Sequence, residues 1–165
     1  MRKGVALAAL CAGLAAVTTS AAANPDGARI YRQQCAVCHQ PDGAGTAGFI
    51  PPLKGTLGHF LRVDEGRRYL PLVVQHGLAG RIMVSGVPYN SNMPAFGRGL
   101  ESAEQAAVLN YVLTELTPQS TPDDFEPYDA EAIEALTQDG VSGAQAVREL
   151  RRTLVERLKA EGLKR

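Results

Sequence analysis

The segment Cys35-Ala36-Val37-Cys38-His39 constrains this chain more than any other. It places two thiols three residues apart and an imidazole directly after the second thiol. This is the spacing of covalent haem attachment, in which the thiols bond to the two vinyl groups of one porphyrin edge and the histidine ligates the iron. The sequence therefore predicts one haem c, attached through Cys35 and Cys38 with His39 as an axial ligand.

Two other chemistries use a Cys-x-x-Cys pair, namely thiol redox exchange and zinc binding. A thioredoxin-like site is expected after a strand in a βαβ pattern, and a structural zinc site needs a second pair of ligands at a similar spacing. Neither companion pattern occurs in this sequence. Haem attachment is the favoured interpretation.

An electron-carrying haem also needs a second axial ligand, and Met93 in the segment Asn92-Met93-Pro94-Ala95-Phe96 is the leading candidate. A thioether is a neutral, soft ligand that favours ferrous iron and raises the reduction potential. His59, His76 and Met83 are the alternative ligands, although each has an ordinary structural role available to it. An open sixth position is the further alternative.

The N-terminus has the pattern of a secretory signal peptide. Arg2 and Lys3 precede a small-apolar run over residues 4–17, and alanines follow up to Ala23. The run is short for a membrane-spanning helix, which needs about 20 residues. We expect cleavage near Ala23, a periplasmic location and no membrane span after processing. A lipid-modified Cys11 is a less favoured alternative, because Leu10 stands where a small residue would be expected.

The net charge is zero, but the charges are unevenly distributed. Residues 24–100 carry 8 basic and 4 acidic side chains, residues 101–139 carry 10 acidic and no basic ones, and residues 140–165 carry 7 basic and 3 acidic ones. The basic residues are neither in excess nor interleaved with aromatics, so no nucleic-acid partner is predicted. The acidic stretch is expected to be a solvated face, although it could also steer a partner.

Helical spacing of apolar residues predicts an all-α protein. The expected helices cover residues 26–39, with Asp26 or Asn24 as the N-cap, then 66–76, and 100–116 with Ser102 as the N-cap. Glycine and proline are frequent over residues 43–58 and 80–99, so both segments are expected to be loops, the second holding Met93. Strands should be scarce, because almost no segment alternates with period two.

The C-terminal part has a different composition. A Pro- and Asp-rich segment at 117–129 is expected to be a linker, followed by helices near 130–137 and 142–160. In the last helix Val147, Leu150, Leu154 and Leu158 fall on one face, which we expect to dock on the protein's own core. The predicted organisation is a signal peptide (1–23), a haem domain (24–117) and an acidic linker with a helical extension (118–165).

From about Pro25 to Leu116 the order of motif helix, methionine loop and last aromatic helix resembles the class I cytochrome c family. The resemblance implies that Gly27 and Tyr31 on the first helix pack against Val108 and Tyr111 on the last one. It implies Met93 as the sixth ligand.

The same resemblance places the Pro-x-Leu of the family at Pro51-Pro52-Leu53. The Pro51 carbonyl would then accept a hydrogen bond from the outer ring nitrogen of His39. Such a bond fixes the ring and raises its basicity as a ligand.

The segments 80–84 and 92–96, with Tyr89 between them, are similar to cytochrome subunits that accept electrons from periplasmic dehydrogenases. The resemblance implies a non-enzymatic electron carrier, acting either as a soluble shuttle or as a dehydrogenase subunit. Its expected partners are redox proteins, with a periplasmic dehydrogenase or a terminal oxidase as candidates. The alternative is a haem enzyme or gas-binding cytochrome with an open iron position.

Overall fold

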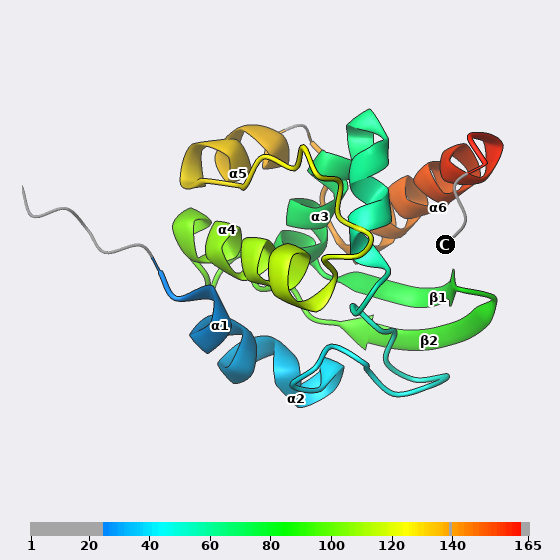
Figure 1. Ribbon diagram of the computed structural model, residues 1–165, viewed down its shortest axis with the longest axis horizontal. Coiled ribbons are helices and arrows are strands. Elements are labelled where there is room, and N and C mark those ends of the chain that lie inside the picture. Colours follow the sequence, from blue (N-terminus) through cyan, green and yellow to red (C-terminus); the bar gives the residue numbers. More distant parts are fainter. Residues whose placement is uncertain (1–24, 139, 163–165) are drawn as a thin grey trace, which may run out of the picture.

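The computed structural model describes residues 25–138 and 140–162, and the predicted signal peptide lies outside them. The described chain is mostly helical and includes one two-stranded hairpin (Figure 1). This confirms the expected class I cytochrome c fold, with the hairpin as an addition. The elements are α1 (Gly27–Ile30), η1 (Tyr31–Cys35), α2 (Ala36–His39), η2 (Leu57–Arg62), α3 (Asp64–His76), β1 (Leu78–Val84), β2 (Val87–Met93), α4 (Ser102–Tyr111), η3 (Val112–Leu116), α5 (Ala130–Thr137) and α6 (Ala144–Ala160).

The elements α1, η1 and α2 follow one another as a single helical run that ends at His39. Asp26 caps its start as predicted, because its carboxylate accepts a hydrogen bond from the Arg29 amide at 3.0 Å. The middle segment, η1, is a short π-helix, and the run stops at Gln40, whose φ is +66°. The Cys-x-x-Cys-His motif therefore lies at the C-terminal end of this helix, as expected.

The first helix packs closely against α4 (Figure 1). Gly27 allows this approach, since a Cβ there would lie 2.1 Å from the Ala107 carbonyl oxygen. Further along, the rings of Tyr31 and Tyr111 lie 5.5 Å apart, and Val108 belongs to the same buried cluster as Tyr31. The helix pairing implied by the resemblance is confirmed.

We expect Gly27→Ala to destabilise the protein by about 1–3 kcal/mol, because the added methyl group must push α1 away from the α4 backbone. Denaturant unfolding of the haem-loaded protein measures this loss. Gly99→Ala is the matched control, since a Cβ at Gly99 meets its nearest heavy atom at 3.8 Å. Equal effects of the two substitutions would contradict the role given to Gly27.

The segment at 80–99 was expected to be a loop, and this expectation is wrong for most of it. Residues 78–93 form the antiparallel pair β1 and β2, in which Leu78 pairs with Met93. The connecting residues Ser85 and Gly86 both have positive φ, as a tight two-residue hairpin turn requires. Met93 is therefore held at the end of a strand rather than in a flexible loop.

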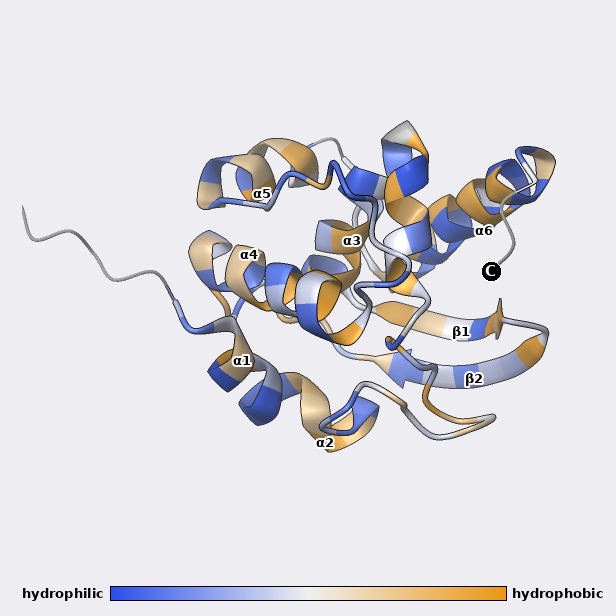
Figure 2. Cartoon of the chain, viewed as in Figure 1, coloured by the Kyte–Doolittle hydropathy of each residue, from blue (hydrophilic) through white to orange (hydrophobic). Residues whose placement is uncertain are grey.

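The C-terminal helices pack on the rest of the protein, as expected for the last one. α5 contacts α3 and α4, while α6 contacts α3 and β1. Figure 2 shows apolar and polar residues on different sides of α6. One core joins η2, α3, α4, η3, α5 and α6, and buried side chains in it include Phe60, Leu72, Leu113, Ile133, Val147, Leu154 and Leu158. No helix of the described chain has the length and apolar character needed to cross a membrane.

The segment expected to be a linker has no helix or strand, but it is firmly anchored. The Asn110 side chain donates to the Tyr128 carbonyl and accepts from the Tyr128 amide, both at 2.8 Å. The Tyr128 hydroxyl donates to the Arg67 carbonyl at 2.7 Å, and Tyr128 is 3% exposed. These bonds hold the extension against α3 and α4.

Candidate haem site

His39 is buried at the end of α2, with 8% of its surface exposed. Its Nδ1 atom lies 3.1 Å from the Pro51 carbonyl oxygen. A carbonyl only accepts hydrogen bonds, so Nδ1 carries the proton and Nε2 keeps its lone pair. The ring thus presents a nitrogen that can ligate a metal.

Burial lowers the pKa of His39, because a cationic ring loses hydration in this environment, and the hydrogen bond to Pro51 opposes the shift only in part. The neutral ring is favoured near neutral pH. The neutral form is also the one that binds metals.

A tight loop returns the chain from His39 to Pro51. The Gly45 amide donates to the His39 carbonyl at 2.9 Å, and the Leu53 amide donates to the Gly43 carbonyl at 2.8 Å. Gly45 has φ +66°, and a Cβ there would lie 2.4 Å from the Ile50 carbonyl oxygen. Glycine at this position lets the loop fold back far enough to place the Pro51 carbonyl beside the histidine.

Cys35 and Cys38 are free thiols, the first half-buried and the second exposed. Burial, followed by the neighbouring charge of Cys38, raises the pKa of Cys35 to about 11. Redox-active dithiols of the thioredoxin type have the opposite property, a lowered thiol pKa. Within residues 25–138 and 140–162, no three His, Cys, Asp or Glu side chains are grouped to hold a metal ion.

A large apolar cavity opens beside the motif helix and reaches into the core. About 910 Å³ of empty space, which includes solvent at its open mouth, lies between its walls. Its lining is almost entirely apolar, as is common for cofactor and ligand sites. A second cavity of about 730 Å³ adjoins it and includes Cys38 and Val37 in its lining. Both are lined by Cys35, His39, Pro51, Leu78, Ile82, Met93 and Phe96.

The predicted site residues therefore meet at one place, although they come from distant parts of the sequence. Met93, at the end of β2, lines both cavities together with His39. None of the alternative ligands His59, His76 and Met83 is among the lining residues of these two cavities. Met83 lies instead on β1 with 45% of its surface exposed.

These residues fit a haem c. The cavity offers apolar walls for a flat macrocycle, a neutral imidazole with a free Nε2, a thioether and, beside its mouth, the two thiols that form covalent bridges. The fold and the site define a c-type haem protein.

Comparison with known proteins agrees with this class. The family model described as Cytochrome c matches residues 25–115. A cytochrome c-552 of Thermus thermophilus is 40% identical over 129 residues, which cover 78% of this chain and 86% of that protein. The chain belongs to the cytochrome c family, and it is an electron-carrying monohaem cytochrome.

A second group of relatives consists of subunits of larger enzymes. The cytochrome c subunit of alcohol dehydrogenase (quinone) from Gluconacetobacter polyoxogenes is 34% identical over 93 residues. The match covers 56% of this chain and 19% of that subunit. The subunit from Gluconobacter oxydans is 31% identical over 86 residues, which cover 52% of this chain and 17% of that subunit.

Sequence reasoning missed several lining residues. Leu78 and Ile82 belong to β1, which was not predicted, so nothing pointed to their place in the wall. Arg151 of α6 also lines the larger cavity. Its place on the inner face of α6 could have been predicted from the sequence, since position 151 falls on the same helical face as Val147 and Leu154.

Proposed function

We propose that this chain carries single electrons on one haem c, attached through Cys35 and Cys38 and ligated by His39 and Met93, with residues 24–117 as the cytochrome domain. When bound, the haem supplies an iron that takes up and releases one electron. The observation that carries the proposal is the shared apolar cavity, which His39 and Met93 both line.

The protein's own groups set the properties of this site. The Pro51 carbonyl orients the His39 ring and holds its proton on Nδ1. Met93 contributes a neutral ligand, which favours the reduced state. The apolar walls keep water away and disfavour the more highly charged oxidised state. Together these features support a carrier of relatively high potential, in which His39 and Met93 would both hold the iron.

A redox titration followed by the optical spectrum tests the proposal. We expect a one-electron transition, a weak long-wavelength band from iron–thioether ligation in the oxidised protein, and no binding of carbon monoxide to the reduced protein. Ready binding of carbon monoxide by the native protein would instead support a gas-binding cytochrome or haem enzyme with an open position.

We further propose that the chain is exported to the periplasm, with cleavage near Ala23, and exchanges electrons with a protein partner. The dehydrogenase subunits among its relatives support a periplasmic dehydrogenase as that partner. A terminal oxidase is the other candidate for a soluble carrier. Purification of the native protein under mild conditions tests this choice: a stable complex supports the role of dehydrogenase subunit, and an isolated monohaem protein supports the soluble shuttle.

A further inference from the structure

Arg151 occupies an unusual place for a charged residue. It lies on the inner face of α6 between Val147 and Leu154, which are 0% and 2% exposed. Arg151 itself is only 6% exposed. Burying a charged group without a partner of opposite charge is costly. We therefore expect a group that compensates the buried positive charge of Arg151.

The contacts of Arg151 within the protein supply only part of that compensation. Its Nη2 donates a hydrogen bond to the Met83 carbonyl at 3.0 Å, and its guanidinium carbon lies 5.7 Å from the centre of the Phe60 ring. Among the residues that the structure describes, no carboxylate lies within ion-pair distance of this side chain. A carbonyl and an aromatic face lower the cost of burial but leave the charge unneutralised.

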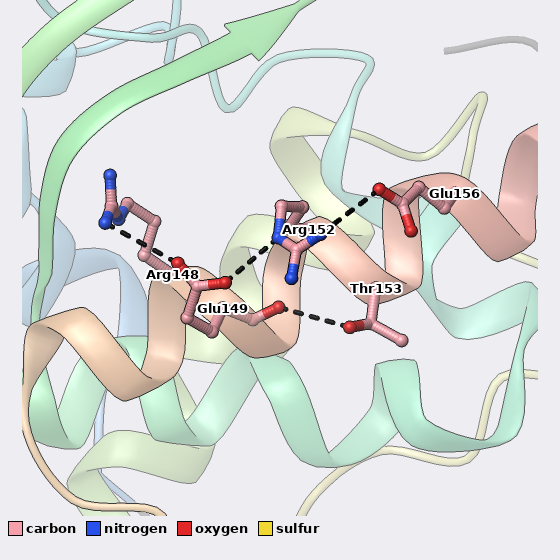
Figure 3. Close-up of polar contacts among 5 residues, drawn as sticks. All are labelled: Arg148, Glu149, Arg152, Thr153 and Glu156. Atoms are coloured by element: carbon pink, nitrogen blue, oxygen red, sulfur yellow. Dashed lines mark hydrogen bonds and ion pairs between the residues drawn. The ribbon is translucent and has the colours of Figure 1, made fainter.

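The adjacent arginines of α6 behave differently (Figure 3). Arg148 pairs with Glu149 at 3.5 Å, and Arg152 pairs with Glu149 at 2.9 Å and with Glu156 at 3.5 Å. The Arg152 side chain is 65% exposed. The surface of α6 thus provides carboxylates for its exposed arginines, and within the described chain the buried one has none.

The position of Arg151 relative to the cavities indicates where its partner lies. It lines the large apolar cavity that also contains His39 and Met93, and it lines a shallow groove between β1 and α6 together with Arg81 and Arg148. Arg151 therefore stands in the wall between the two. A negatively charged group within the apolar cavity can contact Arg151. Because little water screens the charges there, a hydrogen bond between the two charged groups would be strong.

A haem carries two carboxylate side chains on its porphyrin. We propose that Arg151 is the counter-ion of one of these carboxylates, so that the C-terminal extension contributes a cofactor-binding residue. The inference rests on the proposed haem site and adds a function for α6. Arginine suits the task, because its planar guanidinium can donate two parallel hydrogen bonds to a carboxylate.

The proposal has a consequence for the reduction potential. A positive charge beside the carboxylate offsets the negative charge near the iron and keeps the carboxylate ionised. When the arginine is removed, the uncompensated carboxylate favours the oxidised state, so the potential falls. As the pH is lowered, that carboxylate takes up a proton and the potential rises again. The wild-type potential should be nearly independent of pH over the same range.

The test is the midpoint potential of the haem-loaded Arg151→Gln variant between pH 5 and pH 8. We expect a lower potential than wild type at pH 8 and a new rise towards pH 5. Arg151→Lys keeps the positive charge, so its midpoint potential at pH 8 should lie between those of the wild type and Arg151→Gln. Arg152→Gln is the matched control and should follow the wild type, since its exposed partners lie on the surface.

The outcomes separate this inference from the haem assignment. If the variants carry haem but Arg151→Gln has the potential and pH profile of wild type, the counter-ion role is wrong and the haem site stands. A loss of stability alone, with an unchanged pH profile, would also overturn it. If the wild-type protein holds no haem, the proposed function itself fails.

Discussion

Replacing both Cys35 and Cys38 by alanine should abolish covalent haem attachment completely. The two thiols are the only groups beside the cavity in the described chain that can form thioether bridges. We expect the variant polypeptide, after denaturation, to have the mass of the processed chain alone. It should also be strongly destabilised, because the apolar side chains that line the cavity would lose the tethered group that packs against them.

Intact-mass spectrometry and haem staining of denatured gels measure this loss. Val37→Ala is the matched control, since Val37 lies between the two cysteines, is 80% exposed and supplies no bridging atom. It should keep a full complement of haem. Haem that stays attached to the double cysteine variant through denaturation would show that the attachment site lies elsewhere.

Met93→Ala should leave the haem attached and open one side of the iron. The variant loses the thioether that lines both cavities, and no other methionine of the described chain lines them to replace it. We expect the long-wavelength band of the oxidised protein to disappear, the potential to fall, and carbon monoxide binding to change from undetectable to stoichiometric.

Optical spectra of the oxidised protein and carbon monoxide titration of the reduced protein measure these changes. Met83→Ala is the control, because Met83 is partly exposed on β1 and its hydrogen bond with Arg151 is made by its backbone carbonyl. Its spectrum should match the wild type. An unchanged spectrum and potential in Met93→Ala would exclude Met93 as the sixth ligand.

The parts of the site that depend on local spacing could be predicted from the sequence. The thiols and His39 lie within about one and a half turns of helix, so their proximity follows from helix geometry. Gly27 and Tyr31 could be placed against α4 because the family resemblance supplied the packing partner. The hydrogen bond between His39 and Pro51, expected on the same ground, is present in the structure.

The hairpin could not be predicted, because its strands lack the alternation that marks a half-buried sheet. β2 contains Pro88 and the polar run Asn90-Ser91-Asn92, and in β2 only Tyr89 is fully buried. The strands form because of the tight turn at Ser85 and Gly86 and because β1 packs on α6. The second of these causes is a tertiary contact, which no local pattern reveals.

Two further details were set by contacts that sequence spacing does not show. The start of α4 is capped by Glu101, whose side chain forms a capping box with Glu104, rather than by the expected Ser102. By its spacing Arg151 lies on the apolar face of α6, but its side chain is charged. A charged residue on an apolar helix face can indicate a binding site. Only the structure shows that Arg151 lines the cavity in which a ligand could contact it.

The mass of the purified, denatured wild-type protein tests the central claim most directly. We predict a coloured polypeptide that begins near Asn24 and carries the added mass of one haem. The haem should stay attached after denaturation, when all non-covalent contacts are lost. A colourless protein with the mass of the polypeptide alone would contradict the haem site and every role assigned to the residues around it.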